Sequence, residues 1–171
     1  MLTRLFYSKI NKFIINNMNT KKLSKFLIAA KINTYALNGE KGEKKYFDGR
    51  KELKYKKDKY KYCDRYYGYN PFIGEEIVRE NNKIIWGMNY YGIITSKIIS
   101  PRLVYQFLKK ALMKVKQLRP YRGPLKFTQG DLQYVNRAIG NLKKFNGEEI
   151  IFYKGKKIYE LNYGGGVINE K

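Results

Sequence analysis

One motif occurs twice in this chain at a fixed offset, and it constrains the fold more than any other feature. Residues 72–78 read FIGEEIV, and residues 145–151 read FNGEEII. Each motif is followed by a second apolar segment that contains Asn-Tyr and ends in glycine, at 84–92 and 157–165. Repeated sequence of this kind indicates a repeated supersecondary unit, because each copy has to bury the same side chains. The sequence therefore predicts a duplicated architecture.

Each copy is typical of a β-hairpin. Its two segments are rich in β-branched and aromatic residues, which favour strands. Asn81-Asn82 separates the segments of the first copy, and Lys154-Gly155 separates those of the second. Asn and Gly tolerate the positive φ that tight two-residue hairpin turns require. We therefore expect two hairpins, each closed by a two-residue turn.

Side chains alternate along a strand, so each hairpin has two faces. With simple two-residue turns, Glu75 is expected opposite Met88 and Glu148 opposite Leu161. The face with these residues carries the large aromatic side chains, so we expect it to form the core, with the two glutamates at its edge. The other residues expected on this face are Ile77, Trp86, Tyr90, Ile150, Tyr159 and Tyr163. Those expected on the opposite face are Glu76, Asn89, Glu149 and Asn162.

A helix and a further strand precede each hairpin. Apolar residues at helical spacing predict helices over about 20–32 and 101–118. Ser100 is expected to cap the second helix. Strands are expected at 60–68 and 132–140, which share tyrosine, Asp or Asn, arginine and glycine at matched positions. The repeat unit is therefore helix, connector, strand and hairpin.

These elements predict an α+β fold with two tandem αβββ repeats related by a pseudo-twofold axis, in which two helices pack on an antiparallel sheet. We expect one domain over 19–169, with repeats at 19–95 and 100–168. Residues 1–18 are basic, and their apolar residues are interrupted by polar ones. A signal peptide and an amphipathic helix are alternatives, but we expect a tail or leader outside the fold.

The composition limits the chemistry. Histidine is absent and Cys63 is the only cysteine, so the commonest metal ligand and an internal disulfide are excluded. We expect no catalytic residue, no metal, no cofactor and, because no apolar run approaches roughly 18 residues, no transmembrane segment. A cytoplasmic location is expected for a chain with so little cysteine. The formal net charge of +22 indicates either a nucleic-acid surface or the lysine-rich composition of proteins from AT-rich genomes.

The connector over 38–57 concentrates this charge and carries aromatic residues. As a flexible basic loop it could clamp a single nucleic-acid strand by charge and base stacking. Alternatively, it is a solvated segment whose last part, 53–62, forms an edge strand protected by lysines. A nucleic-acid interface would use this loop, taken over 38–61, and the lysine face of the second helix. Its candidate residues are Lys44, Lys45, Arg50, Lys51, Lys54, Lys56, Lys57, Lys109 and Lys110.

Five short motifs occur together: FxGEE at 72–76, WxMNYxG at 86–92, RGP at 122–124, GDL at 130–132 and GEE at 147–149. This combination resembles a bacterial family of uncharacterised domains whose members are often found behind a Cro/repressor (XRE)-type helix-turn-helix. The resemblance covers about 23–168 and implies no catalytic residue. Because the leader is too short to be a helix-turn-helix, a regulatory role is implied by domain company alone.

We expect a non-enzymatic binding or regulatory module, with a small molecule or a protein partner bound in an aromatic, acid-edged cleft between the repeats. Trp86 and Tyr159 would stack on the ligand, and Arg122 would hold a carboxylate or phosphate or tie to a hairpin glutamate. The alternatives are a nucleic-acid-binding protein and an enzyme with two carboxylates as acid and base. The candidate ligand-binding residues are Glu75, Trp86, Tyr90, Arg122, Glu148, Tyr159 and Tyr163.

Overall fold

The computed structural model describes residues 20–36 and 42–169, so the predicted tail at 1–18 lies outside the described residues. Within this part of the chain, nine strands form one open antiparallel sheet in the order β1-β2-β3-β4-β5-β9-β8-β7-β6. The strands are β1 (Lys44–Lys45), β2 (Lys51–Lys57), β3 (Tyr60–Gly68), β4 (Phe72–Glu80), β5 (Lys83–Ile94), β6 (Lys126–Gln129), β7 (Leu132–Asn141), β8 (Lys144–Tyr153) and β9 (Lys156–Val167).

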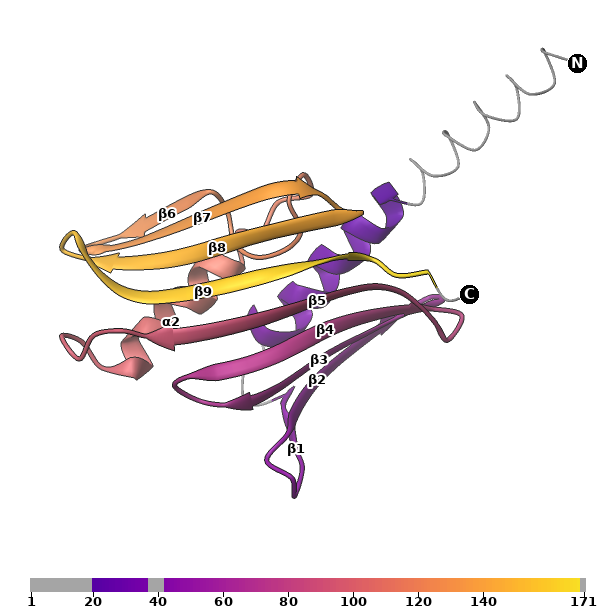
Figure 1. Cartoon of the computed structure of the whole chain (residues 1–171), viewed down its shortest axis with the longest axis horizontal. Coiled ribbons are helices and arrows are strands. Elements are labelled where there is room, and N and C mark those ends of the chain that lie inside the picture. Colours follow the sequence, from indigo (N-terminus) through magenta and orange to yellow (C-terminus); the bar gives the residue numbers. More distant parts are fainter. Residues whose placement is uncertain (1–19, 37–41, 170–171) are drawn as a thin grey trace, which may run out of the picture.

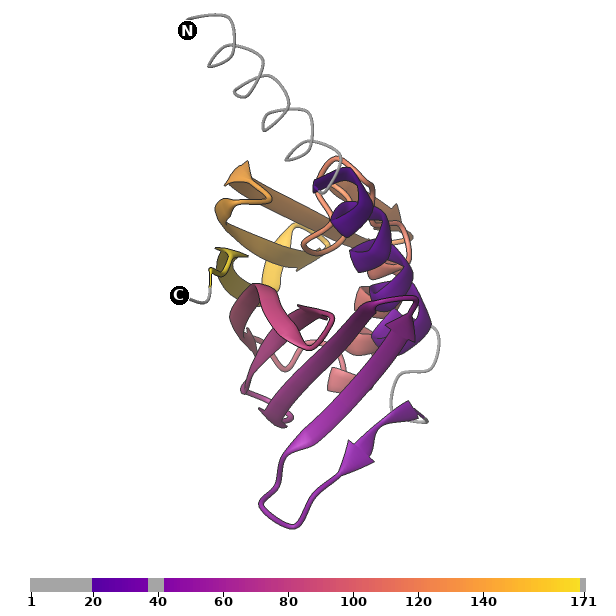
Figure 2. The same ribbon diagram turned by 90° about the vertical axis from the view of Figure 1, so that its right-hand side faces the viewer.

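Two helical segments lie on one side of the sheet. The first covers residues 20–31 and continues into the π-helical turn η1 (Ile32–Ala36). The second is α2 (Pro101–Leu112). Figure 1 shows both behind the sheet, and Figure 2 shows the sheet curving around them. We call the sheet face toward the helices the inner face and the other the outer face. The expected α+β class, an antiparallel sheet with two helices, is confirmed.

The core lies between the helices and the inner face. Leu27 from the first helix and Leu108 from α2 pack into one cluster with Trp86 and Tyr159 from the two central strands, and all four side chains are almost completely buried. The long strands β5 and β9 pair at the centre of the sheet, with Tyr90 opposite Tyr163. Burial of large apolar side chains at this junction supplies most of the driving force that joins the two halves of the sheet.

The predicted hairpins form with the predicted turns. Asn81 and Asn82 have φ values of 48° and 70°, and Lys154 and Gly155 have 48° and 77°. These left-handed conformations match the two-residue turns whose twist suits antiparallel strands. β3 covers 60–68, as the sequence predicts.

The predicted faces are correct for the second strand of each hairpin, β5 and β9, where Trp86 and Tyr159 are buried. They are wrong for the first strands, β4 and β8, because each hairpin contains a β-bulge that the turn-based register omits. The register shifts between Val78 and Arg79 and between Ile151 and Phe152. Beyond the bulge, Glu76 pairs with Met88 and Glu149 pairs with Leu161. One extra residue exchanges the two faces of a strand.

Glu76 and Glu149 therefore lie on the inner face and are 2% and 0% exposed. The side chains of Glu75 and Glu148 lie on the outer face, 46% and 43% exposed, where they pair with arginines of the neighbouring strands. In the same way, Val78 and Ile151 occupy the core positions predicted for Ile77 and Ile150, which are only partly buried.

The second helix is shorter than the predicted 101–118. It ends at Leu112, because the following turns bring Tyr121 back to stack on Phe145, with ring centroids 3.9 Å apart. The side chain of Ser100 makes no capping hydrogen bond, contrary to expectation. Its backbone carbonyl instead accepts hydrogen bonds from the amides of Leu103 and Val104, at 3.0 and 3.3 Å.

The basic connector forms strands where the structure describes it. The predicted edge strand over 53–62 is instead parts of β2 and β3, which are joined by a turn at Asp58-Lys59. β2 lies one strand in from the edge, because the short β1 covers it. The β1–β2 hairpin protrudes from the sheet in Figure 1. The flexible-loop interpretation is therefore wrong for 42–61.

The central β5–β9 pairing predicts a sharp difference between two neighbouring glycines. A methyl group on Gly165 would lie 2.1 Å from the backbone oxygen of Gly87, whereas one on Gly164 would meet nothing closer than 3.5 Å. We expect Gly165→Ala to lower the free energy of unfolding by about 3 kcal/mol, since the strands have to separate. Gly164→Ala, the matched control, should change it by less than about 1 kcal/mol. Urea unfolding followed by circular dichroism measures both, and equal stabilities would contradict this pairing.

Candidate functional site

A closed cluster of polar side chains surrounds Glu149 on the inner face. Arg122 donates two hydrogen bonds to this carboxylate, from Nε at 3.1 Å and Nη2 at 2.7 Å. The hydroxyls of Tyr134 and Tyr159 donate two more, at 2.7 and 2.9 Å. A buried carboxylate needs this degree of pairing, because desolvation of an unpaired charge is costly. The interpretation of Arg122 as a structural tie to a hairpin glutamate is therefore correct, with Glu149 as the partner.

Asn136 of β7 completes this cluster. Its Oδ1 accepts a hydrogen bond from the hydroxyl of Tyr163 at 2.7 Å, and its Nδ2 donates one to the backbone oxygen of Gly123 at 3.0 Å. Both ends of the amide are thus used. The groups around Glu149 satisfy one another, so this half of the inner face offers a ligand little to bind.

A second polar cluster lies on the inner face of the other half of the sheet and is less complete. Lys31 of the first helix donates to Glu76. Asp64 of β3 stands beside Glu76 of β4 and accepts a hydrogen bond from the Tyr90 hydroxyl at 2.6 Å. Trp86, which the sequence repeat matches with Tyr159, has an indole nitrogen without a hydrogen-bond partner within the described residues. Asp64 thus occupies the position that Asn136 holds in the closed cluster.

The environment of Asp64 makes it titratable near neutrality. Burial raises the pKa of its carboxyl, and the neighbouring Glu76 raises it further. The hydrogen bond from Tyr90 and the charges of Lys31 and Arg122 act in the opposite direction, and the resulting pKa is about 7. Burial also lowers the pKa of Lys31, an effect that its contact with Glu76 opposes.

A pocket opens beside this second cluster, between the inner face of β3–β5 and the segments η1 and α2. Its cavity volume is about 80 Å³. It is lined by six aromatic side chains together with Lys51, Lys109, Arg122 and Asp64. Asp64, Tyr90 and Arg122 also belong to the buried set, so they form its inner end. The aromatic residues are Tyr35, Tyr66, Tyr69, Phe72, Tyr90 and Tyr105.

The structure brings together only part of the predicted ligand-binding set. Tyr90 and Arg122 line the pocket. Trp86 and Tyr159 are 0% exposed and Tyr163 is 4% exposed, so these three rings are core side chains rather than walls of an open cleft. Glu75 and Glu148 lie on the outer face, away from the pocket, because the β-bulge in each hairpin shifts the register.

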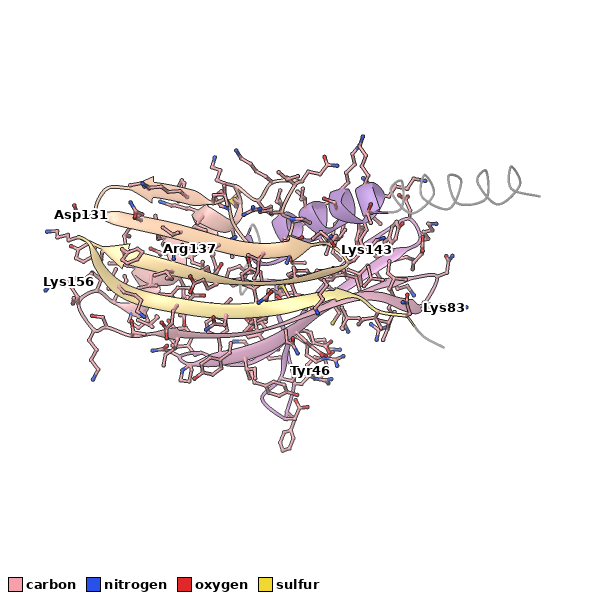
Figure 3. The ribbon with its side chains drawn as sticks, turned by 45° about the horizontal axis from the view of Figure 1, so that its top comes forward. Tyr46, Lys83, Asp131, Arg137, Lys143 and Lys156 are labelled. Carbon is pink, nitrogen blue, oxygen red and sulfur yellow. The ribbon has the colours of Figure 1, made fainter. Side chains whose placement is uncertain are left out.

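The predicted nucleic-acid residues are also dispersed. Lys51 and Lys109 line the pocket. Arg50 and Lys54 pair with the buried Glu52, whose pKa is raised by burial but lowered to about 2 by hydrogen bonds from Lys54, Tyr46 and Arg65. Lys44 and Lys45 form the edge strand β1, and Lys56, Lys57 and Lys110 are exposed. Figure 3 shows labelled lysines at both ends of the sheet, Lys83 and Lys143 at one and Lys156 at the other.

Sequence reasoning missed Asp64 and most of the aromatic wall. The available signal was the acid–amide pair in the matched strands, aspartate at 64 against asparagine at 136. A carboxyl in one strand that is replaced by an amide in its match marks a place where the halves differ in chemistry. The contributions of Tyr35, Tyr69 and Tyr105 depend on how η1 and α2 pack, which has no local signature in the sequence.

The residues that the structure describes contain no group of three or more His, Cys, Asp or Glu side chains that could hold a metal ion. Among the same residues, we find no helix with the length and apolar character needed to cross a membrane.

A protein-family model with the description "Domain of unknown function (DUF5680)" matches residues 64–168, which is more than half of the chain. The match begins at Asp64 and includes β4–β9 and α2. The chain matches no curated protein and no solved structure.

Adjacent glutamates provide a test of the register and of the closed cluster. Glu149→Gln should destabilise the fold by about 3–5 kcal/mol, because it leaves the buried Arg122 guanidinium without an anionic partner. Glu148→Gln, one residue away, removes only an exposed pair with Arg137 and should cost less than about 1 kcal/mol. Thermal and urea unfolding at neutral pH compare the two. A larger effect at Glu148 would favour the register predicted from the turns.

The raised pKa of Asp64 predicts a pH-dependent stability. Since its folded pKa lies above the ordinary value, ionisation of Asp64 destabilises the fold progressively between about pH 4 and pH 7. Asp64→Asn, which retains an acceptor for Tyr90, should therefore be more stable than the wild type at pH 8 by about 4 kcal/mol and nearly equal at pH 4.

The groups that set this pKa are Glu76, Tyr90, Lys31 and Arg122, from four different parts of the fold. Asn136→Asp is the matched control: it places a carboxylate against the Gly123 carbonyl and beside Glu149, so it should lose stability at pH 8. A stability difference between Asp64→Asn and the wild type that does not change with pH would rule out a shifted Asp64.

Proposed function

The chain belongs to the DUF5680 family, whose function is unknown, and we propose that it is a non-enzymatic module that binds a small molecule in the pocket beside Asp64. The single observation that carries this proposal is the pairing of an aromatic wall with polar groups at a buried inner end. Small-molecule sites have this form, a concave and mostly apolar surface with a few placed polar groups that fix orientation.

The aromatic wall supports a ligand that contains a flat ring. Tyr69, Phe72 and Tyr90 are linked through edge-to-face contacts in which Tyr105 takes part, with centroids 5.1 to 6.1 Å apart. The hydroxyl of Tyr105 also donates to the backbone oxygen of Tyr69, which fixes the ring of Tyr105. Rings held by one another lose little entropy when a ligand binds, so the wall is preorganised.

The charges at the mouth support a ligand with an anionic group. Lys51 lies over the ring of Tyr66 at 5.3 Å and donates to the Gly68 backbone oxygen at 3.1 Å. Lys109 lies over the ring of Tyr35 at 5.5 Å. These two ammonium groups come from different elements, β2 and α2, and both line the same opening.

We further infer that the fold is a duplication and that the ligand binds between its halves, as the sequence predicts. The strand order supports a duplication, since β2–β5 and β9–β6 run outward from the central pair in mirrored sequence order, and Tyr90 pairs with its own counterpart Tyr163. Two groups of the second half, Arg122 and α2, meet β3–β5 and η1 of the first half at the pocket. In this view the cluster around Glu149 is closed by its pair with Arg122, and the cluster around Asp64 and Glu76 has become the ligand site.

A regulatory role and an association with a helix-turn-helix remain predictions that rest on the family resemblance. Nucleic acid binding is the second candidate, and the formal charge of +22 favours it. A pocket ligand would need only the lysines at the pocket, whereas a nucleic acid would use exposed lysines as well. Substitutions of two lysines at a time can therefore separate the two functions.

We expect native mass spectrometry of the protein purified from its natural host to detect a bound small molecule. The double variant Lys51→Gln/Lys109→Gln, which removes both cations at the mouth, should lose this adduct. Lys56→Gln/Lys110→Gln is the matched control: it removes the same charge from the same two elements at exposed positions, and it should retain the adduct.

A fluorescent single-stranded oligonucleotide provides the opposing test. Phosphate-driven binding depends on the number of cations, so both double variants should weaken it equally and salt should abolish it. Absence of any adduct, together with equal loss of oligonucleotide binding in both variants, would replace the small-molecule function with nucleic acid binding.

A further inference from the structure

The pocket beside Asp64 has a clear depth gradient. Asp64, Tyr90 and Arg122 at the inner end are 6–8% exposed, whereas Tyr69 at the mouth is 51% exposed. Lys51 and Lys109 lie between these extremes. A ligand therefore meets uncharged rings and two ammonium groups at the entrance, and one carboxyl and one guanidinium at the end.

The two charged groups at the inner end retain unused hydrogen-bonding capacity. The Oδ1 atom of Asp64 accepts from Tyr90, and within the described part of the chain its Oδ2 atom accepts no hydrogen bond. Arg122 uses Nε and Nη2 for Glu149, and over the same residues its Nη1 donates none. Both side chains line the pocket. The inner end thus presents carboxylate acceptors beside a guanidinium donor.

The pocket has room for one flat ring. A single water needs roughly 10–15 Å³ of such space, so the cavity volume of about 80 Å³ holds roughly five to eight waters. Tyr90 and Phe72 line the pocket, so a ring bound at the inner end would lie against them. Lys51 and Lys109 line the same pocket and are available to a polar tail on that ring.

The hydrogen-bond acceptors and donors at the inner end of the pocket match the edge of one common nucleobase. A carboxylate accepts two parallel N–H donors, which guanine presents at N1 and at its exocyclic N2 amine. Guanine carries the O6 acceptor next to N1, where a guanidinium can donate. Adenine presents an unprotonated ring nitrogen at N1, which a carboxylate repels. The acceptor and donor at the end of this pocket are complementary to guanine.

We propose, building on the small-molecule function above, that the pocket binds a guanine mononucleotide, with the N1–H and N2 edge on Asp64, O6 toward Arg122 and the phosphate between Lys51 and Lys109. Asp64 is then the specificity-determining residue, and the two lysines recognise the phosphate. The closed cluster around Glu149 lacks this capacity, because Asn136 presents an amide whose two ends are already bound.

Isothermal titration calorimetry of the full chain with GMP, AMP, XMP and guanosine tests this assignment. We expect GMP to bind at least tenfold more tightly than AMP, since only guanine offers the paired donors. GMP should also bind more tightly than guanosine, and Lys51→Gln/Lys109→Gln should remove that difference, whereas Lys56→Gln/Lys110→Gln should preserve it.

The decisive variant is Asp64→Asn. An amide cannot accept two N–H donors in parallel, but it can donate to the C2 carbonyl that xanthine has in place of the guanine amine. We expect this variant to lose at least tenfold in GMP affinity and to bind XMP more tightly than GMP. A purely structural role for Asp64 would lower the affinity for both nucleotides together, so a reversal of preference is specific to direct contact with the base.

Equal affinity of the wild type for GMP and AMP, or an unchanged preference in Asp64→Asn, would overturn the guanine assignment. Native mass spectrometry separates this failure from failure of the proposed function. An adduct of another mass that depends on Lys51 and Lys109 would keep the pocket as a small-molecule site with a different ligand. Absence of every adduct, with no nucleotide bound in the calorimeter, would overturn both.

Discussion

The buried ion pair between Glu149 and Arg122 sets the conditions for the rest of the inner face. Glu149 is completely buried, and Arg122, Tyr134 and Tyr159 donate four hydrogen bonds to its carboxylate. Removal of any one donor leaves part of a charge unpaired in a medium of low polarity. This requirement fixes the path of the turn after α2, since Arg122 has to reach the sheet from the helix side. The stacking of Tyr121 on Phe145 holds the same segment against the sheet.

The same arginine connects the closed cluster to the pocket. Its guanidinium lies 5.5 Å from the ring of Tyr90, whose hydroxyl binds Asp64. The two clusters differ mainly in what occupies the position beside the buried glutamate. Both ends of the Asn136 amide are hydrogen-bonded in the closed cluster, whereas Asp64, among the residues that the structure describes, keeps an acceptor oxygen free in the other cluster. Under the proposed function, this difference of one side-chain atom leaves hydrogen-bonding capacity for a ligand beside Glu76 and little beside Glu149.

The sequence predicts most of the elements well, but it assigns the wrong faces to the first strand of each hairpin, β4 and β8. The hairpins follow from local features, because Asn81-Asn82 and Lys154-Gly155 have the conformational freedom that the turns need. The faces of Glu75, Glu76, Glu148 and Glu149 do not follow, since a single bulged residue exchanges them and a bulge has no distinct composition here. The chemistry offers another argument. Each copy has two adjacent glutamates, and only the glutamate that faces a basic side chain across the core can be buried. Arg122 forms the structural tie to a hairpin glutamate that the sequence suggests, but which glutamate it binds depends on the register of the hairpin.

The placement of Arg122 has a consequence for how sequences of this kind can change. The residue is encoded in the second half of the chain, neutralises a charge in that half and forms part of the wall of a hollow in the first. A substitution that abolishes the acid on β8 frees this cation to move, and the shape of a distant opening changes with it. Positions 64, 122 and 149 are therefore expected to vary together among homologous chains, even though they lie on three separate segments.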